Sequence, residues 1–178
     1  MGGLVCAGLG GLALAATATA SPTWAVALWI ASALCIQFRL AANMLDGMVA
    51  IESGRASRLG ELYNDVPDRF ADAAILIGVG YAAGGDVVLG YAATAAAILT
   101  AYIRALGVSV GAGAEFCGPM AKPHRMHVVT VAALWSAFAP AWAWPAPATL
   151  ALIIVVVGSL LTTLRRLRRI VRTIGERP

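Results

Sequence analysis

Residues 24–46 read WAVALWIASALCIQFRLAANMLD, an apolar run whose far end carries an asparagine and an aspartate. The part from Trp24 to Ile36 contains no charged residue. A helix rises about 1.5 Å per residue, so about 20 apolar residues cross the roughly 30 Å hydrocarbon core of a bilayer. The stretch therefore predicts a membrane-spanning helix with Asn43 and Asp46 at one end.

The rest of the chain also has the composition of a membrane protein. Of its 178 residues, 60% are hydrophobic and 12% are charged, whereas about 25% of a soluble domain is charged. Ala, Leu and Gly dominate, and no stretch alternates apolar and polar side chains as a barrel strand does. We therefore expect an all-α integral membrane protein with six transmembrane helices. The six segments are 3–20, 24–46, 60–83, 87–107, 126–144 and 146–163, the third being apolar from 70 onward.

The basic residues indicate the orientation of these segments. All 13 Lys and Arg residues lie in or near the second and fourth connections or after the sixth segment, and the other three connections hold none. Because Lys and Arg are enriched on the cytoplasmic side, we expect both termini in the cytoplasm and the protein in the inner (cytoplasmic) membrane. The net charge of +4 then reports orientation and does not indicate nucleic-acid binding.

The chain is expected to form one domain followed by a tail. Residues 1–164 are predicted to be the transmembrane domain, with its active site at the cytoplasmic face. Residues 165–178 are predicted to be a basic cytoplasmic tail that contacts anionic lipid headgroups. A secretory signal peptide is the alternative for the first 20 residues, because Ala-Thr-Ala precedes Ser21, although the positive start of such peptides is missing.

The candidate site is read from the polar residues between positions 43 and 72. This stretch holds six of the nine acidic residues, and carboxylates near membrane depth mark functional sites by default. Asn43 and Asp46 share one helical face, and Asn64, Asp68 and Asp72 share another, because residues three or four apart lie above one another. Two such faces turned together would offer oxygen ligands to a divalent cation such as Mg²⁺.

The same stretch resembles the signature of the CDP-alcohol phosphotransferases, integral membrane enzymes of phospholipid synthesis. That signature reads D-x2-D-G-x2-A-R-x8-G-x3-D-x3-D, and this chain keeps every spacing. Two of the signature aspartates are asparagines here and its arginine is an isoleucine, which identifies a variant of the pattern. The corresponding residues are Asn43, Asp46, Gly47, Ala50, Ile51, Gly60, Asn64 and Asp68.

The resemblance implies a six-helix bundle that transfers a phosphatidyl-type group from a CDP-alcohol, CDP-diacylglycerol in the first instance, to an acceptor alcohol with release of CMP. It implies Mg²⁺ or Mn²⁺ as cofactor, membrane lipids as partners and a homodimer. Asp68 would bind metal or accept the proton of the attacking hydroxyl. Gly47, Ala50 and Gly60 would let the nucleotide approach the backbone. The implied metal ligands are Asn43, Asp46, Asn64 and Asp68, with Asp72 one turn beyond them.

Basic residues on the same membrane face suit a phosphate. Tyr102-Ile103-Arg104-Ala105 resembles the Tyr-x-Lys/Arg-Ala segment of the family, and residues 118–125 resemble its basic loop. We therefore predict that Arg104, Lys122 and Arg125 contact the phosphate of a phosphorylated acceptor or of a lipid. Arg39 has two interpretations: it reaches a diphosphate, or it extends to the lipid headgroups.

Two other functions remain open at the level of sequence. The two asparagines remove two negative charges from the implied metal cage, which fits a catalytically inactive relative. A small cation-coupled transporter would also use intramembrane carboxylates, but its site should lie near mid-membrane within paired repeats. Here the carboxylates gather at the helix ends, and no repeat is visible.

Overall fold

The computed structural model describes residues 2–52, 58–138 and 146–176, with the side chains of residues 46, 47, 49–52 and 58–64 left outside that description. All regular structure in these ranges is helical. The six helices are α1 (Gly2–Ala16), α2 (Pro22–Glu52), α3 (Arg58–Tyr81), α4 (Val87–Ser109), α5 (Lys122–Phe138) and α6 (Pro147–Gly175).

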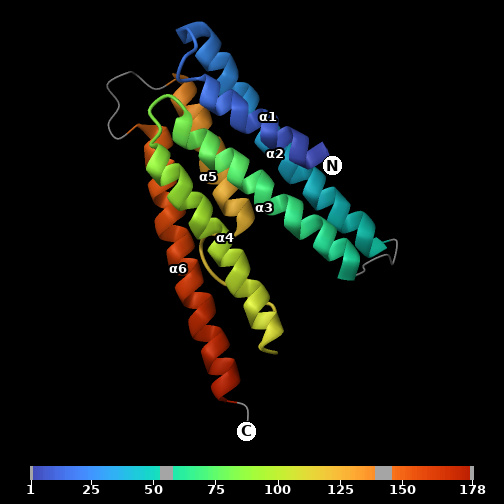
Figure 1. The fold of residues 1–178 in the computed structure, drawn as a ribbon. Coiled ribbons are helices and arrows are strands. Elements are labelled where there is room, and N and C mark those ends of the chain that lie inside the picture. The colour runs from blue at the N-terminus through green and yellow to red at the C-terminus, as the bar shows by residue number, and fades with distance from the viewer. Residues whose placement is uncertain (1, 53–57, 139–145, 177–178) are drawn as a thin grey trace.

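Successive helices run up and down in one bundle (Figure 1). As a result α2, α4 and α6 end on the side of the bundle where α1, α3 and α5 begin. Three helices are long and apolar enough to cross a bilayer: α2 from Pro22 to Leu45, α4, and α6. The chain is therefore a membrane protein, and spanning by the other three helices stays a prediction.

Local sequence features explain several helix boundaries, and the sequence analysis predicted some of these boundaries. The predicted turn at residues 84–86 is present: Gly84 has φ +70°, and the Asp86 carboxylate accepts a 2.8 Å hydrogen bond from the Leu89 amide to cap α4. Helix α5 begins at Lys122, four residues before the predicted start, because Pro123 is tolerated in a first turn, where its missing N–H has no helical partner. Helix α6 continues unbroken through residue 165 to Gly175.

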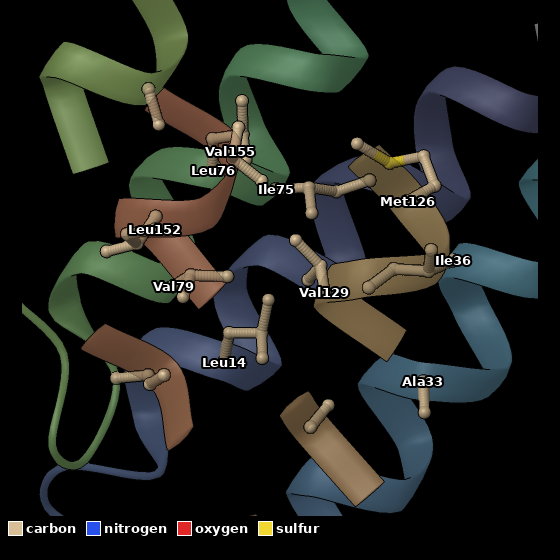
Figure 2. Packing of buried hydrophobic residues seen from close by; sticks show 14 of the residues in the cluster. Leu14, Ala33, Ile36, Ile75, Leu76, Val79, Met126, Val129, Leu152 and Val155 are labelled. Atoms are coloured by element: carbon tan, nitrogen blue, oxygen red, sulfur yellow. The ribbon is translucent and has the colours of Figure 1, made fainter. Parts of the chain in front are cut away.

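The core is built mainly from small and branched apolar side chains, and all six helices contribute to it (Figure 2). Many other large apolar side chains face outward, among them Leu12 at 70% exposed and Val88 at 77%. Such a surface would be unfavourable in water and is the expected one in hydrocarbon. The labelled core residues in the figure are Leu14, Ala33, Ile36, Ile75, Leu76, Val79, Met126, Val129, Leu152 and Val155.

Two glycines bring α1 into backbone contact with α3. A Cβ atom added at Gly11 would lie 2.4 Å from the carbonyl oxygen of Ala74, and one added at Gly78 would lie 2.4 Å from the carbonyl oxygen of Gly11. Close approach through small residues is the usual way in which helices pack within membranes. Helix α1 thereby reaches the site end of the bundle, where Gly3 faces Asn43.

We predict that Gly11→Ala destabilises the protein by about 1–3 kcal/mol, because the new methyl group forces α1 away from α3. Gly8→Ala is the matched control: it lies in the same helix, and a Cβ atom there would meet nothing within 4 Å. Denaturation in detergent, followed by circular dichroism, measures both variants. Equal stabilities for the two would contradict the backbone contact.

Candidate functional site

The site lies where α2 approaches the first half of α3, and Asn43 and Asp68 meet there. The Asn43 amide donates a 2.8 Å hydrogen bond to Oδ1 of Asp68. Arg39, one turn earlier on α2, donates to the same oxygen and to the Asp68 carbonyl, each at 3.3 Å. The side chain of Asp68 keeps 19% of its surface exposed, so it can still meet a ligand. Long side chains thus bring two residues of the signature pattern together between α2 and α3, each of which packs against α1.

A second carboxylate, Asp72, is enclosed between two arginines. Arg39 donates to its Oδ1 at 2.6 Å and Arg125 donates to its Oδ2 at 3.1 Å. All three residues are almost fully buried, with 1–2% of their surface exposed. Buried charges are tolerated when they are paired and hydrogen-bonded. Asp72 thus joins α2, α3 and α5, and its role as a metal ligand stays a prediction.

The structure therefore gives Arg39 and Arg125 an internal role. Arg39 was expected to reach a diphosphate or the headgroups, and the second interpretation is wrong because its guanidinium is buried. Arg125 was expected to contact a phosphate, yet it donates to Asp72, to Thr100 Oγ1 at 3.2 Å and to the Met120 carbonyl at 3.1 Å. It also lines the cavity beside Asp68, so its contact with a phosphate stays a prediction.

Lys122 at the start of α5 forms an ion pair with Oδ2 of Asp68. Arg39 lies against the other oxygen of the same carboxylate, so Asp68 stands between two cations. Burial lowers the pKa of the Lys122 ammonium, and Asp68 offsets only part of that effect. An incoming anion could therefore draw Lys122 away from Asp68.

A cavity of about 220 Å³ opens next to this pair, between α3, α4, α5 and α6. Arg104 reaches it from α4, with its Nη2 2.8 Å from both carboxylate oxygens of Asp65 and its guanidinium over the ring of Phe116 at 5.5 Å. Lys122 and Arg166 also line it, as does Asp68. The cavity combines a carboxylate wall with a cationic wall, which suits a substrate bearing both a hydroxyl and a phosphate.

The sequence analysis missed the roles of Asp65 and Arg166, and it did not foresee the contacts of Arg39. Asp65 orients Arg104, and Arg39 orients both Asp68 and Asp72. Arg166 is 6% exposed and donates to the carbonyl oxygens of Thr100 at 2.8 Å and Cys117 at 3.0 Å. Arg39 could have been assigned to the site from the sequence, because it lies one turn before Asn43. Arg166 could not, because no local feature of the sequence distinguishes it from the neighbouring Arg165.

The described side chains allow a test of whether the implied metal site suits a divalent cation. Asn43 and Asp68 carry amide and carboxylate oxygens, the hard donors that Mg²⁺ and Mn²⁺ prefer, and the amide nitrogen of Asn43 is the atom that faces Asp68. Among the described side chains no three His, Cys, Asp or Glu lie close enough to hold a metal ion. The remaining predicted residues belong to α2 and α3, but their side chains lie outside the described part: Asp46, Gly47, Ala50, Gly60 and Asn64. The donor chemistry fits a hard cation at Asn43 and Asp68, and Asp72 is paired with the arginines.

Comparison with known proteins finds similar sequences and solved structures with a similar fold. No protein-family model matches the chain. Phosphatidylinositol phosphate synthase of Streptomyces avermitilis is 32% identical over 145 residues, which are 75% of this chain and 58% of the relative. Archaetidylinositol phosphate synthase of Aeropyrum pernix is 32% identical over 110 residues, 62% of this chain and 56% of the relative. The chain thus spans a little over half the length of the curated relatives that it matches.

Crystal structures of phosphatidylinositol phosphate synthase from Mycobacterium tuberculosis resemble the whole bundle. The structure with manganese and citrate has a TM-score of 0.74 at 24% identity, covering 94% of this chain and 78% of the other. The two proteins share a fold. The CDP-DAG-bound structure of the same enzyme has a TM-score of 0.68.

We predict that Asp72→Asn destabilises the protein by about 3–5 kcal/mol, because it leaves Arg39 and Arg125 buried without a counter-charge. Asp65→Asn makes the same chemical change at a side chain that is 41% exposed, and its cost should stay within about 1 kcal/mol. Chemical denaturation of both variants in one detergent gives the comparison. A loss at Asp72 no larger than that at Asp65 would rule out the buried bridge as a main support of the bundle.

Proposed function

We propose that this protein is a CDP-alcohol phosphotransferase of phospholipid synthesis, which moves a phosphatidyl-type group from a CDP-alcohol to an acceptor alcohol and releases CMP. The observation that carries the proposal is the meeting of Asn43 and Asp68 beside a cavity lined by Arg104 and Lys122. The 32% identity to two synthases of phosphatidyl- and archaetidylinositol phosphate supports the same reaction class.

In the proposed reaction, an acceptor hydroxyl attacks the β-phosphorus of the CDP-alcohol. The new oxygen–phosphorus bond forms as the bond to CMP breaks, and CMP leaves with that electron pair. The hydroxyl proton passes to the Asp68 carboxylate, which acts as general base. While Lys122 is paired with Asp68 it keeps this carboxylate a weak base. A phosphate that draws Lys122 away makes Asp68 a stronger base, so that binding of the acceptor prepares the site.

Asn43 and Asp68, with Asp46 and Asn64 one turn along each helix, are the proposed ligands for Mg²⁺ or Mn²⁺. When bound, such an ion neutralises the diphosphate and stabilises the CMP leaving group. Gly47, Ala50 and Gly60 are proposed to face the nucleotide. Asn43 also holds Asp68 in place through its hydrogen bond. Manganese in the Mycobacterium tuberculosis enzyme supports this choice of cation.

Arg104 and Lys122 are proposed to bind the phosphate of the acceptor, with Arg166 at the same cavity and Arg125 holding their surroundings in place. Guanidinium groups bind phosphate through paired hydrogen bonds. The names of the two relatives support an inositol phosphate as the first acceptor to test. The CDP-DAG-bound neighbour supports CDP-diacylglycerol as donor.

The proposed topology has six spans, both termini in the cytoplasm of the inner membrane, and the site at the cytoplasmic face. The lysines and arginines cluster at the end of the bundle that holds Asp68, as the positive-inside rule requires of a cytoplasmic end. A homodimer is proposed from the resemblance alone. An active site at this face has direct access to the soluble acceptor and to the donor lipid.

Asp68→Asn is predicted to lower metal-dependent CMP release at least about a hundredfold, because it removes a ligand and the proton acceptor. The assay uses purified protein in detergent with CDP-diacylglycerol, Mn²⁺ and inositol phosphate. Asp86→Asn is the matched control, since asparagine also caps helices and Asp86 lies at the opposite end of the bundle. Full activity of Asp68→Asn would refute the mechanism, and no CMP release by the wild-type protein with any acceptor would favour an inactive relative or a transporter.

Arg104→Gln is predicted to raise KM for a phosphorylated acceptor about 10- to 100-fold. This increase corresponds to the loss of a charge-assisted hydrogen bond, which contributes about 1.5–3 kcal/mol. Arg104→Lys should restore part of the affinity, because lysine keeps the positive charge but lacks the paired N–H donors of the guanidinium group. Steady-state kinetics with inositol phosphate measure both variants. An unchanged KM in Arg104→Gln would remove this residue from the acceptor site.

A further inference from the structure

A second basic cavity lies outside the proposed active site. Its volume is about 410 Å³, and it opens between Cys117 and Gly118 of the α4–α5 connection and the last turns of α6. Four arginines of α6 line it: Arg165, Arg168, Arg169 and Arg172. We call it the arginine cleft. It shares no lining residue with the cavity at Asp68.

The four arginines gather because they are spaced by three or four residues on one helical face. All four are exposed. Arg169 has a counter-charge, with its Nη1 3.6 Å from Oε2 of Glu115. Within the described residues, Arg165, Arg168 and Arg172 form no ion pair or side-chain hydrogen bond. Four guanidinium groups beside one carboxylate leave a strong positive potential, which a bound anion would relieve.

The wall opposite the arginines is held firmly against α6. The Met120 amide donates to Thr162 Oγ1 at 2.9 Å, and Arg166 donates to the Cys117 carbonyl at 3.0 Å. Gly118, at φ +121°, approaches so closely that a Cβ atom there would lie 2.4 Å from Thr162. The cleft is therefore formed by the fold itself and needs no ligand to assemble it.

An apolar track on α6 leads directly to the cleft. Ile154, Val157 and Leu161 are apolar side chains of the kind that face hydrocarbon, with 42%, 51% and 46% of their surface exposed, respectively. With spacings of three and four they continue along the same face into Arg165 and Arg168. Arg165 lies about 27 Å along the helix from Pro147, close to the thickness of a hydrocarbon core. The arginines thus begin at the depth at which lipid phosphates lie.

We propose that the arginine cleft binds the phosphate of an anionic membrane phospholipid, whose acyl chains lie along Ile154, Val157 and Leu161. Exposed guanidinium forks match the geometry of a phosphate oxygen pair. The apolar track selects a lipid over a free phosphate, because a soluble anion gains nothing from it. The proposal is independent of the reaction at Asp68, and its test needs no turnover.

The test measures retained lipid by native mass spectrometry on full-length protein that has been delipidated in detergent. The probes are short-chain phosphatidylglycerol, phosphatidylcholine of equal chain length, and inorganic phosphate. Wild-type protein should retain phosphatidylglycerol in preference to the other two. The triple variant Arg165→Gln, Arg168→Gln, Arg172→Gln should bind it at least about tenfold more weakly, since each basic residue near a membrane surface strengthens the attraction to anionic lipid.

Two further variants keep the result interpretable. The triple change of the same arginines to lysine conserves charge and should retain most of the preference for phosphatidylglycerol. Arg168→Gln alone tests the cleft if the triple glutamine variant fails to fold, and it should weaken binding several-fold. Equal retention of phosphatidylcholine, stronger binding of inorganic phosphate than of lipid, or undiminished binding by Arg168→Gln in a folded protein would each overturn the proposal.

Discussion

The carboxylate of Asp72, enclosed by Arg39 and Arg125, ties together the three helices that form the site. Each of its oxygens receives a charge-assisted hydrogen bond from a different helix. Removing any member would strand a buried charge, which costs far more than a surface ion pair. The bridge also sets the position of Asp68, because Arg39 contacts the carboxylates of both Asp68 and Asp72. A structural carboxylate and a chemically available one therefore lie one helical turn apart and share a single arginine.

The other two cations near Asp68 are also held by acidic side chains. Lys122 pairs with Asp68, and Arg104 is held by Asp65 and Phe116. Both cations have acidic partners in the absence of substrate, so an incoming phosphate must exchange with a carboxylate. Such exchange makes binding selective for anions that offer at least two oxygens. The cavity that results is small and polar, while the lipid-facing surfaces of the same helices are apolar.

Much of the fold was predictable from residue patterns along the chain. The helical segments were recognised because membrane spans need long apolar runs, and the turn at Asp86 because glycines and a capping aspartate stand together. The predicted start of α5 was wrong by four residues, since Pro123 was not recognised as a first-turn residue. The pairing of Asn43 with Asp68 follows from spacing once α2 and α3 run antiparallel, which the short connection between them favours.

The sequence by itself determined the helical membrane class, the clustering of charge at one end of the bundle, and the set of polar residues from which a site could be made. These depend on local composition and on helical periodicity, which a single chain carries in full. Only the tertiary structure decided that Asp72 is a support and Asp68 is available, that Arg125 faces inward, and that Arg166 joins one cavity while Arg165 joins another. Adjacent residues on a helix point about 100° apart, so the packing of neighbouring helices decides which of two similar side chains becomes buried.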